Sequence, residues 1–288
     1  MSPLFPYRKT LGHDLAVATV SEPARSQSVV KYPRTYHLQG SRLLPGDDDA
    51  SQVSIESLAT AQLVIEEKLD GANAALSFSS EGALRLQSRG YLLAGGPRER
   101  HFAMFKTWAA TIRDALHPVL RDRYVVYGEW LYAKHTVFYD ALPHWFMEFD
   151  VWDRESACFL STPRRHALLA GTPIVSVPVI HEGVVHNEGA LRGMIMPSLY
   201  KTKDWREVLS RKAASQELDV QRVLRQTDPH VEGEGLYIKH ERDGAVVGRY
   251  KFIRPSFSQA VIDSDGHWLD RPIIANELAD GVDILAQG

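Results

Sequence analysis

The chain has 288 residues, of which 44% are hydrophobic and 24% are charged, values close to those of ordinary folded proteins. This length allows one large domain or two smaller ones, with a core that needs no metal or disulfide support. With a formal net charge of -3, the protein lacks the overall basicity of many duplex-DNA-binding proteins. Any contact with nucleic acid therefore requires a local basic surface.

Cys158 is the only cysteine, so an intramolecular disulfide is excluded. This excludes a secreted disulfide scaffold and favours a reducing compartment, and we expect a cytoplasmic location. The N-terminal residues contain no continuous apolar segment, and no uninterrupted apolar stretch reaches membrane-spanning length. We therefore expect neither a signal peptide nor a membrane helix.

The first part of the chain predicts short strands joined by turns. Residues 1–62 show weak periodicity, which indicates loops and short strands with room for one helix. Residues 63–67 are typical of a strand that leads into Lys68, and residues 74–79 of its partner strand. A Ser-Glu-Gly turn then leads into residues 83–89, where apolar and polar residues alternate. This order favours an antiparallel meander over a parallel βαβ unit.

The remainder mixes helices and strands. Apolar residues at helical spacing, a Ser-Thr-Pro start signal and a long segment without Gly or Pro predict helices over 101–121, 163–169 and 199–226. Strand-like segments cover 123–131, 145–153, 235–240 and 246–253, the last two joined by an Arg-Asp-Gly turn. We expect an α+β fold in one domain, residues 1–254, followed by a short C-terminal extension, residues 255–288.

The segment Glu66-Glu67-Lys68-Leu69-Asp70-Gly71 ends the first apolar strand. A lysine is a nucleophile only when it is neutral. The ordinary pKa of a lysine is about 10.4, so burial or nearby cations must lower it. Lys239 and Lys251, on strands late in the chain, are candidate cations, as is a bound metal. Taken alone, the short motif equally fits a charged strand end followed by a turn.

Further polar motifs follow Lys68 in a fixed order. They are Ser88-Arg89-Gly90, Tyr127-Gly128-Glu129-Trp130, Phe146-Met147-Glu148-Phe149-Asp150, Glu234-Gly235-Leu236-Tyr237-Ile238-Lys239 and Arg249-Tyr250-Lys251-Phe252. The set resembles the covalent nucleotidyltransferases, which comprise RNA ligases, DNA ligases and mRNA capping enzymes. The spacing of 21 residues from Lys68 to Arg89, and of 17 from Glu234 to Lys251, is also similar to that family.

The ATP-dependent RNA ligase branch is the most similar. The upstream segment from Lys31 to Ser41 looks like the Tyr-Pro-Lys, His and Gly-Ser pattern that precedes the lysine motif in RNA-ligase-like proteins. The resemblance covers residues 31 to 254 and implies a ligase adenylation domain, with antiparallel sheets around a nucleotide cleft and helices outside. Only 37 residues follow Lys251, too few for the OB-fold domain of DNA ligases and capping enzymes, so we expect no OB-fold domain.

The resemblance implies a role for each motif residue. Lys68 would attack the α-phosphate of ATP to give lysyl-AMP and release pyrophosphate. Arg89 would contact the ribose or the incoming 5′-phosphate, because its fork suits phosphate oxygens. Glu129 would hold ribose hydroxyls, and Phe149 would stack on adenine, with Phe146 as a possible substitute because an aromatic in an apolar strand is usually core.

The motifs near the end of the chain would bind the metal and neutralise the negative charge of the phosphates. Glu234 would help to bind Mg²⁺ or Mn²⁺, and Lys239, Arg249 and Lys251 would neutralise the α-phosphate and the leaving group. Arg249 departs from the family's usual lysine, which puts the contact of that position in doubt. The resemblance assigns nucleotide binding also to Glu67, Asp70, Gly71, Lys239 and Lys251.

The resulting hypothesis is an RNA ligase that uses ATP and a divalent metal to join 3′-OH and 5′-phosphate RNA ends. A separate end-healing kinase or phosphatase is a candidate partner, and no membrane partner is expected. The alternatives are a DNA ligase, a capping-type guanylyltransferase, or a non-catalytic module that binds RNA ends. The scattered histidines do not have metal-site spacing, and the basic helix at 199–226 fits an RNA-facing stripe or a solvated face equally well.

Overall fold

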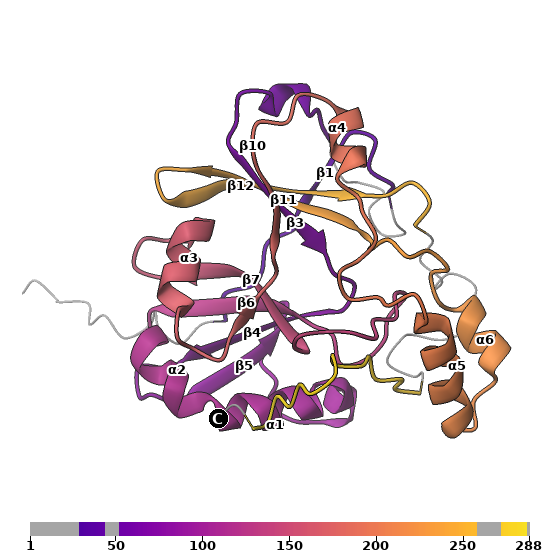
Figure 1. Ribbon diagram of the computed structural model, residues 1–288. Helices are drawn as coiled ribbons and strands as arrows, with labels where there is room; N and C mark the ends of the chain where they lie inside the picture. Colours follow the sequence, from indigo (N-terminus) through magenta and orange to yellow (C-terminus); the bar gives the residue numbers. More distant parts are fainter. Residues whose placement is uncertain (1–28, 44–51, 258–271, 287–288) are drawn as a thin grey trace, which may run out of the picture.

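The computed structural model describes residues 29–43, 52–257 and 272–286. Within these ranges the strands form one hydrogen-bonded sheet that folds into two halves (Figure 1). The half that carries Lys68, the β3 half, contains β10 (Val179–Gly183), β3 (Leu63–Lys68), β11 (Gly235–Arg242), β12 (Ala245–Ile253), β1 (Tyr36–Leu38) and β2 (Gln52–Val53). The β6 half contains β7 (Phe146–Asp153), β6 (Tyr124–Trp130), β4 (Ala72–Phe78), β5 (Leu84–Ser88) and β9 (Val175–Ser176).

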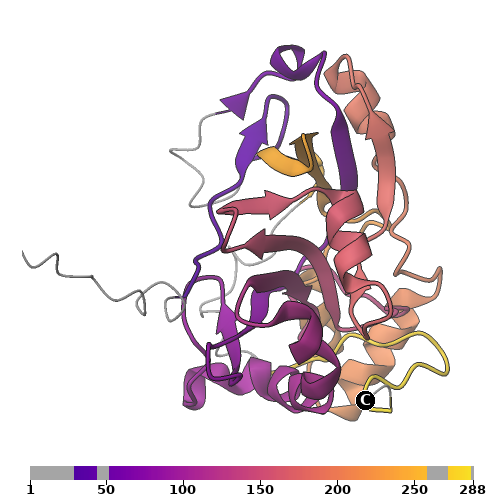
Figure 2. The same ribbon diagram turned by 90° about the vertical axis from the view of Figure 1, so that its left-hand side faces the viewer.

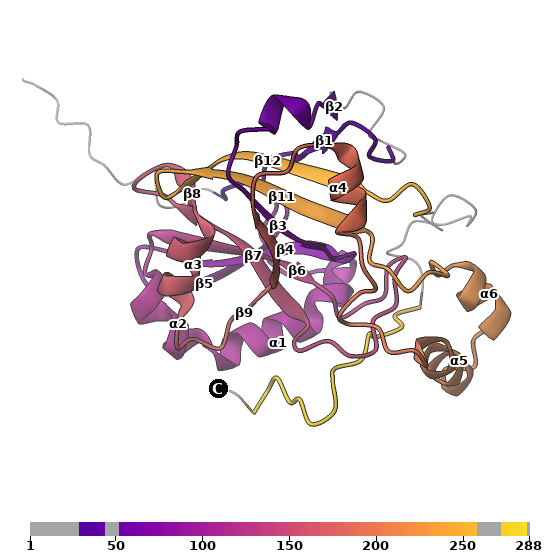
Figure 3. The same cartoon turned by 45° about the horizontal axis from the view of Figure 1, so that its top comes forward.

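The short strand β8 (Cys158–Leu160) pairs with both β12 and β7 and so joins the two halves. Figure 3 shows β11 and β12 lying over the strands of the β6 half. All pairs in the main path are antiparallel, as the turns in the sequence predict. The expectation of an α+β fold with antiparallel strands is confirmed.

Helices cover the outer faces of the sheet. The chain forms η1 (Glu56–Leu58), η2 (Pro97–Phe102), α1 (Ala103–Thr111), α2 (Arg113–Leu120), α3 (Thr162–Leu169), α4 (Glu188–Gly193), α5 (Trp205–Ser215) and α6 (Val220–Arg225). Figure 2 shows α1 and α2 lying beneath the β6 half, where Phe105, Trp108 and Leu116 are fully buried. The apolar spacing that predicted one helix over 101–121 thus describes two helices with a break at Ile112.

The two halves also pack against each other. Tyr127 and Val125 of β6 and Ala75 of β4 point away from α1 and contact Tyr32 and Phe159 in a separate buried cluster. The residues on this inner face alternate with those on the helix-covered face, as expected for strands buried on both sides. Tyr127, from the second of the downstream motifs, therefore lies where the two halves meet.

One expected pairing is wrong. The strand over 74–79 was expected to pair with the strand over 63–67, but β4 pairs with β5 and β6, whereas β3 pairs with β10 and β11. The corner after Lys68 carries the chain from one half to the other, so the neighbours of β3 come from more than 100 residues later in the sequence.

Residues 272–286 continue the same folded unit. The side chain of Asn276 is fully buried, donates to the carbonyl of Leu131 at 2.7 Å and accepts from the amide of Tyr139 at 3.0 Å. Ile284 joins the core beneath the β6 half, at 2% exposure. The boundary at residue 254 stays a prediction, and residues 258–271 of the expected extension lie outside the described residues. In the part of the chain that is described, no helix combines the length and apolar character that crossing a membrane requires.

Candidate active site

Lys68 is the last residue of β3 and lies opposite Gly235, the first residue of β11. Its ammonium Nζ is 2.6 Å from Oε2 of Glu234, the residue just before β11. The side chain of Glu234 is 5% exposed, whereas that of Lys68 is 26% exposed. A buried carboxylate thus pairs with a lysine that a substrate can reach from solvent.

Backbone amides hold the corner that follows β3. Oδ2 of Asp70 accepts hydrogen bonds from the amides of Thr136 and Val137, each at 2.7 Å. The amide of Gly71 donates to Oε1 of Glu129 at 3.1 Å. Asp70 therefore fixes the corner to a neighbouring loop, and Glu129 is brought to the same place from β6.

The space around residue 71 has no room for a Cβ, so the position requires glycine. A Cβ at this position would lie 2.7 Å from the carbonyl oxygen of Trp130 and 2.9 Å from Cδ2 of Leu131. The first atom belongs to the backbone of β6, which cannot move without disturbing its pairing with β4. The Lys-Leu-Asp-Gly sequence thus has a local explanation: the aspartate closes the corner and the glycine lets β6 approach.

Acidic side chains surround Lys68. Burial lowers its pKa, but the charges of Glu234, Glu129 and Asp70 outweigh burial and raise the pKa above its ordinary value. The expectation that cations around Lys68 lower its pKa is therefore wrong for the protein without a bound ligand. The amine is held charged and oriented by carboxylates.

The carboxylates are shifted in turn. Burial raises the pKa of Glu129 to about 8, opposed by the charge of Lys68 and supported by that of Glu234. Burial also raises the pKa of Glu234, while Lys68 and Lys251 act in the opposite direction. The positive charge of Lys251 on β12 therefore acts on Glu234.

Lys239 lies farther away than expected. It is opposite Val64 on β3, four positions before Lys68, which corresponds to about 13 Å along the strand. Its Nζ is fully buried, 3.1 Å from the carboxylate of Glu66 and 3.5 Å from that of Asp150. The structure does not bring Lys239 to Lys68.

Arg249 lies opposite Lys239 on β12, one strand farther from β3, so it is also remote from Lys68. Its guanidinium is 4.0 Å from the ring centre of Phe159 and 5.5 Å from that of Tyr32. This stacking suits a flat guanidinium and explains locally why the position holds arginine. Of the late basic motif residues, Lys251 is the one whose charge acts on Glu234 beside Lys68, whereas Lys239 and Arg249 lie deeper between the two halves.

A buried ionic network occupies that deeper position. Arg165 of α3 pairs with Glu66 and with Glu148, the latter at 2.6 Å, and Lys239 pairs with Glu66 and Asp150. All five side chains are fully buried. The network joins α3, β3, β7 and β11. Sequence reasoning missed Arg165, although the alternation along β3 places Glu66 on the same face as Lys68.

The aromatic residues of the third motif lie on opposite faces of β7. Phe149 is half-buried, with its ring centre 5.4 Å from that of Tyr32 and 5.6 Å from that of Tyr237. Phe146 is fully buried in the helix-covered core, stacked on Phe105 at 5.5 Å. The suggestion that Phe146 could replace Phe149 in stacking on a base is therefore wrong, because Phe146 is on the wrong face.

Arg89 and Glu129 flank a residue that sequence reasoning missed. Ser88 lies opposite Ala74, and Asn73 lies opposite Glu129, so Asn73 stands between the positions of Arg89 and Glu129. Given the spacing of strands, the backbones of Arg89 and Glu129 are on the order of 10 Å apart. Oδ1 of Asn73 is buried and has no hydrogen-bond partner among the residues that the structure describes. An asparagine within an otherwise apolar strand was the available sequence signal.

The upstream segment is tied to the end of β12. Nδ1 of His37 lies 2.8 Å from Oγ of Ser41, and this Oγ accepts a hydrogen bond from the amide of Ile253 at 2.9 Å. His37 is also paired with Lys251 across β1 and β12. The His and Gly-Ser pattern noted in the sequence thus positions the strand that carries Lys251.

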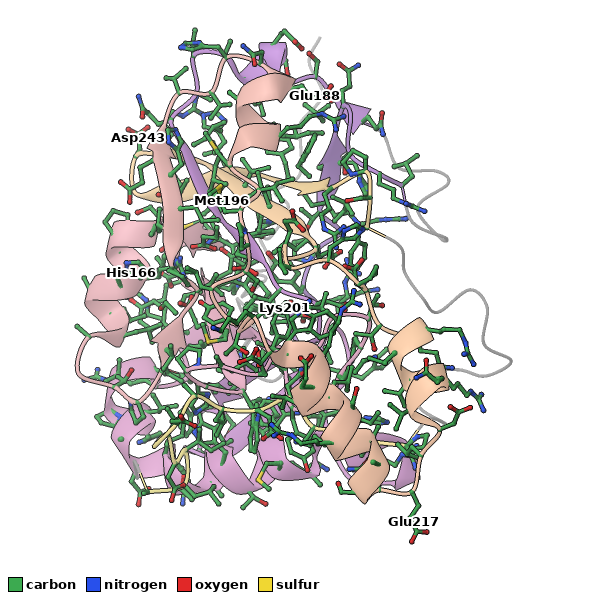
Figure 4. All side chains as sticks on the ribbon, turned by 45° about the vertical axis from the view of Figure 1, so that its right-hand side comes forward. His166, Glu188, Met196, Lys201, Glu217 and Asp243 are labelled. Carbon is green, nitrogen blue, oxygen red and sulfur yellow. The ribbon has the colours of Figure 1, made fainter. Side chains whose placement is uncertain are left out.

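Glu67 faces away from Lys68, as neighbouring residues of a strand do. Its carboxyl is buried, which raises its pKa, and the hydroxyl of Ser198 and the amide of Leu199 oppose this shift by hydrogen bonding. The structure does not bring the Glu67 carboxyl to Lys68. The Glu67 carboxyl lies instead against Ser198 and Leu199, in the segment that leads to Lys201. Figure 4 shows Lys201 near the start of α5.

The carboxylates near Lys68 suit a hard cation only in part. Among the residues that the structure describes, no group of three or more His, Cys, Asp or Glu side chains could hold a metal ion. Glu234 and Glu129 are close enough to influence each other's charge, and Asp70 is already engaged by two amides. The site therefore fits a cation that takes one or two protein oxygens and completes its coordination with water or phosphate oxygens, as Mg²⁺ does.

A search of curated proteins finds no sequence match. Similar solved structures include a Naegleria gruberi RNA ligase variant with ATP and Mn, at 18% identity and a TM-score of 0.49, covering 79% of this chain and 57% of that chain. A variant of that ligase with AMP and Mn gives the same identity and TM-score over 78% and 56%. The Naegleria gruberi ligase with PPi gives 18% identity and a TM-score of 0.48 over 78% and 56%. The chain spans a little over half the length of these proteins.

The sequence model of the family described as RNA ligase matches residues 61–253. The match covers more than half of the chain and contains every motif from Lys68 to Lys251. This chain belongs to the RNA ligase family.

Proposed function

We propose that this protein is an ATP-dependent RNA ligase that joins a 3′-OH end to a 5′-phosphate end through lysyl-AMP and RNA-adenylate intermediates. One observation carries the proposal: Lys68, within a family motif, holds a solvent-accessible amine 2.6 Å from the buried carboxylate of Glu234 and beside the positive charge of Lys251. Such an arrangement orients an amine and places opposite charges where a phosphate would need them.

In the proposed first step, Nζ of Lys68 attacks the α-phosphorus of ATP. A phosphorus–nitrogen bond forms, the bond from the α-phosphorus to its bridging oxygen breaks, and pyrophosphate leaves with that electron pair. The amine must give up a proton first, and the carboxylates of Glu234 and Glu129 are the nearest groups with raised pKa values that could hold it. Lys251 would offset charge on the phosphate.

In the second step, an oxygen of an RNA 5′-phosphate attacks the phosphorus of lysyl-AMP, and the lysine leaves as the free amine. In the third, a 3′-OH attacks the 5′-phosphate phosphorus, a phosphodiester forms and AMP leaves. The second step transfers the adenylyl group from nitrogen to oxygen, the third exchanges one oxygen on the 5′-phosphate phosphorus for another, and neither involves oxidation. Catalysis then depends on orientation and charge rather than on further covalent chemistry.

The positions of the other residues support distinct contacts. Phe149, half-buried on the inner face of β7, would stack on adenine, and Glu129 would contact the ribose hydroxyls. Arg89 is exposed, so its guanidinium is available for a phosphate. Gly71 and Asp70 would act by fixing the corner rather than by touching the nucleotide.

Three residues of the family motifs are better supported as positioning residues. Lys239 and Arg249 are held deep between the sheet halves, and Glu67 faces the opposite side of β3. We propose that they keep β3, β11 and β12 in place. Mg²⁺ or Mn²⁺ would be held by Glu234 and would neutralise charge on the phosphates.

We further infer a role in RNA repair in the cytoplasm. The proposed reaction consumes a 5′-phosphate and a 3′-OH, so broken ends of other chemistry must first be converted. A kinase adds the missing 5′-phosphate and a phosphatase removes a 3′-phosphate. A separate end-healing enzyme is therefore the partner class that this substrate requires.

The test is a joining assay with RNA that carries a labelled 5′-phosphate, ATP and Mn²⁺ or Mg²⁺. Joining makes the label resistant to phosphatase and lengthens or circularises the strand. The same assay with a DNA strand in place of RNA distinguishes the two ligase classes. Binding of the RNA ends with no joining and no adenylylation would instead support a non-catalytic end-binding module.

A further inference from the structure

Two segments far apart in the sequence form one surface beside Arg89. The amide of Tyr32 donates to the carbonyl of Arg89 at 2.9 Å, and Nε2 of Gln87 donates to the carbonyl of Val30 at 2.9 Å. The side chain of Lys31 passes over Gly90, with Cγ 3.1 Å from the position of a Cβ there. Residues 29–33 thus lie directly against the turn at residues 88–91.

This surface is basic in a chain that is acidic overall. The formal net charge of the protein is -3. The segments that form this surface, residues 29–34 and 88–91, nevertheless contain no Asp or Glu, and their basic residues are Lys31, Arg34 and Arg89. Such a local excess of positive charge is the electrostatic pattern of a phosphate-binding surface.

An exposed aromatic residue, Tyr91, lies beside these basic residues. Tyr91 is 79% exposed, the largest exposed fraction among the large hydrophobic residues of the described chain. Its backbone is fixed, because its carbonyl accepts from the amide of Ser88 at 2.9 Å across the turn. An ordered aromatic residue that covers no core, beside cations, is typical of a platform on which unpaired bases stack.

The platform is joined to the candidate active site. Arg89 Nε and a terminal nitrogen donate to the carbonyls of Tyr32 and Pro33 at 3.4 and 3.3 Å. The hydroxyl of Tyr32 in turn donates to Asp150 at 2.5 Å, within the cluster that includes Phe149. A strand whose end reached Arg89 would therefore continue over Tyr91 and Lys31.

We propose that Lys31, Arg89 and Tyr91 form a binding surface for the single-stranded RNA that carries the 5′-phosphate. Arg89 contacts the terminal phosphate, a base near that end stacks on Tyr91, and Lys31 contacts a following phosphate. The proposal rests on the proposed function, and it adds where the 5′-phosphate strand lies. It predicts that the unpaired bases of that strand contribute to affinity.

The test measures binding by the full chain without catalysis. Fluorescence anisotropy is recorded with single-stranded RNA of about ten nucleotides, within the range that such surfaces cover, bearing a 5′-phosphate and a 3′ dye. We expect Tyr91→Ala to weaken binding by about tenfold and Tyr91→Trp to restore it, because stacking requires an aromatic ring. Val247→Ala, at an exposed site on β12, is the matched control and should bind like the wild type.

Salt dependence separates the two kinds of contact. Lys31→Ala should reduce the slope of log Kd against log salt by about 0.7, because one phosphate contact is lost from a single strand, whereas Tyr91→Ala should leave the slope unchanged. Equal affinities of wild type and Tyr91→Ala would overturn the proposal. So would a loss of affinity in Tyr91→Ala that Tyr91→Trp does not restore.

Adenylylation of the protein by labelled ATP keeps this test separate from that of the proposed function. Tyr91→Ala should label like the wild type, since RNA takes no part in that step. Absence of labelling in the wild type would count against the ligase mechanism, whereas normal labelling with unchanged RNA binding in Tyr91→Ala would refute only the stacking surface.

Discussion

Glu129 connects the chemistry of the site with the stability of the fold. Burial raises the pKa of Glu129 to about 8 in the folded protein, whereas its pKa in the unfolded chain is about 4.5. Between these values the folded state binds more protons than the unfolded state, and stability falls as the pH rises. We expect a loss of about 2 kcal/mol, less than the full shift implies because the side chain is only partly buried.

Urea unfolding at pH 5.5 and 8.5 tests this. Burial also raises the pKa values of Glu234 and Glu67, so Glu129→Gln, which keeps the acceptor for the amide of Gly71, should lose only part of the pH dependence of the unfolding free energy. Glu207→Gln, at an exposed position on α5, should retain it. An identical pH profile for wild type and Glu129→Gln would show that this carboxyl is not one of the groups that titrate.

Gly71 gives a steric prediction. A Cβ at this position would lie 2.7 Å from the carbonyl oxygen of Trp130, so Gly71→Ala must displace the corner that orients Lys68. We expect the rate of lysine adenylylation to fall by about 100-fold, the size of effect that a displacement of about 1 Å produces. Gly193→Ala at the end of α4, where a Cβ meets open space, is the control and should leave the rate unchanged. A normal rate in Gly71→Ala would contradict the account of the motif.

At the level of single residues, sequence reasoning identified the types of group but not all their positions. Lys68, Glu129 and Glu234 come together as the motifs imply. Lys239 and Arg249 do not join them, because the register of β11 and β12 places both four positions from the residues opposite Lys68. Strand register depends on pairing between distant segments, which motif order alone does not specify.

Among the elements, α3 is fastened to the sheet by charge rather than by apolar contact alone. Arg165 is fully buried and pairs with Glu66 of β3 and Glu148 of β7. Removing one partner from such a network leaves carboxylates buried without compensation, which costs about 3–5 kcal/mol. Arg165→Leu should therefore lower the unfolding free energy by that amount in urea denaturation.

Arg164, the neighbour of Arg165 on α3, provides the control. Arg164 is exposed and donates to the carbonyl of Gly244 at 3.2 Å. Arg164→Leu should change the unfolding free energy by less than about 1 kcal/mol. Similar stabilities of the two variants would mean that the buried network contributes little to holding α3 on the sheet.

Most elements were predictable because their signals are local. The alternation over 83–89 and the turn before 246–253 gave β5 and β12, and helical spacing gave α1 and α2. The pairing of β3 and the short strand β10 were not predictable, since β10 forms the edge of the sheet beside a strand more than 100 residues earlier. Residues 199–204 precede α5 in irregular structure, although the composition there favours helix.

In the whole molecule, residues 272–286 contribute to the core. The buried side chain of Asn276 bonds to the carbonyl of Leu131 and the amide of Tyr139. Asn276→Ala leaves both groups buried without a partner, so we expect a loss of about 2–3 kcal/mol in urea denaturation. Gln221→Ala, at an exposed position on α6, is the matched control. A wild-type stability for Asn276→Ala would indicate that residues 272–286 are dispensable for folding.

The two sheet halves share the proposed chemistry: Lys68, Glu234 and Lys251 come from the β3 half, and Glu129 and Phe149 from the β6 half. Relative placement of the halves therefore controls the distance from the lysine to the group that binds the base and ribose. That placement depends on β8 and on Arg165, which holds the buried network together, and neither belongs to a family motif. This is why the motifs predicted the chemistry better than the geometry.

The most direct test of the account is covalent labelling of Lys68. The full chain, freed of bound AMP with pyrophosphate, is incubated with α-labelled ATP and Mn²⁺ or Mg²⁺ and resolved on a denaturing gel, beside Lys68→Ala and the exposed-lysine control Lys203→Ala. We predict label on the wild type and Lys203→Ala, and none on Lys68→Ala. No label on the wild type with either metal, or label that persists in Lys68→Ala, would contradict the assignment of Lys68 as the nucleophile.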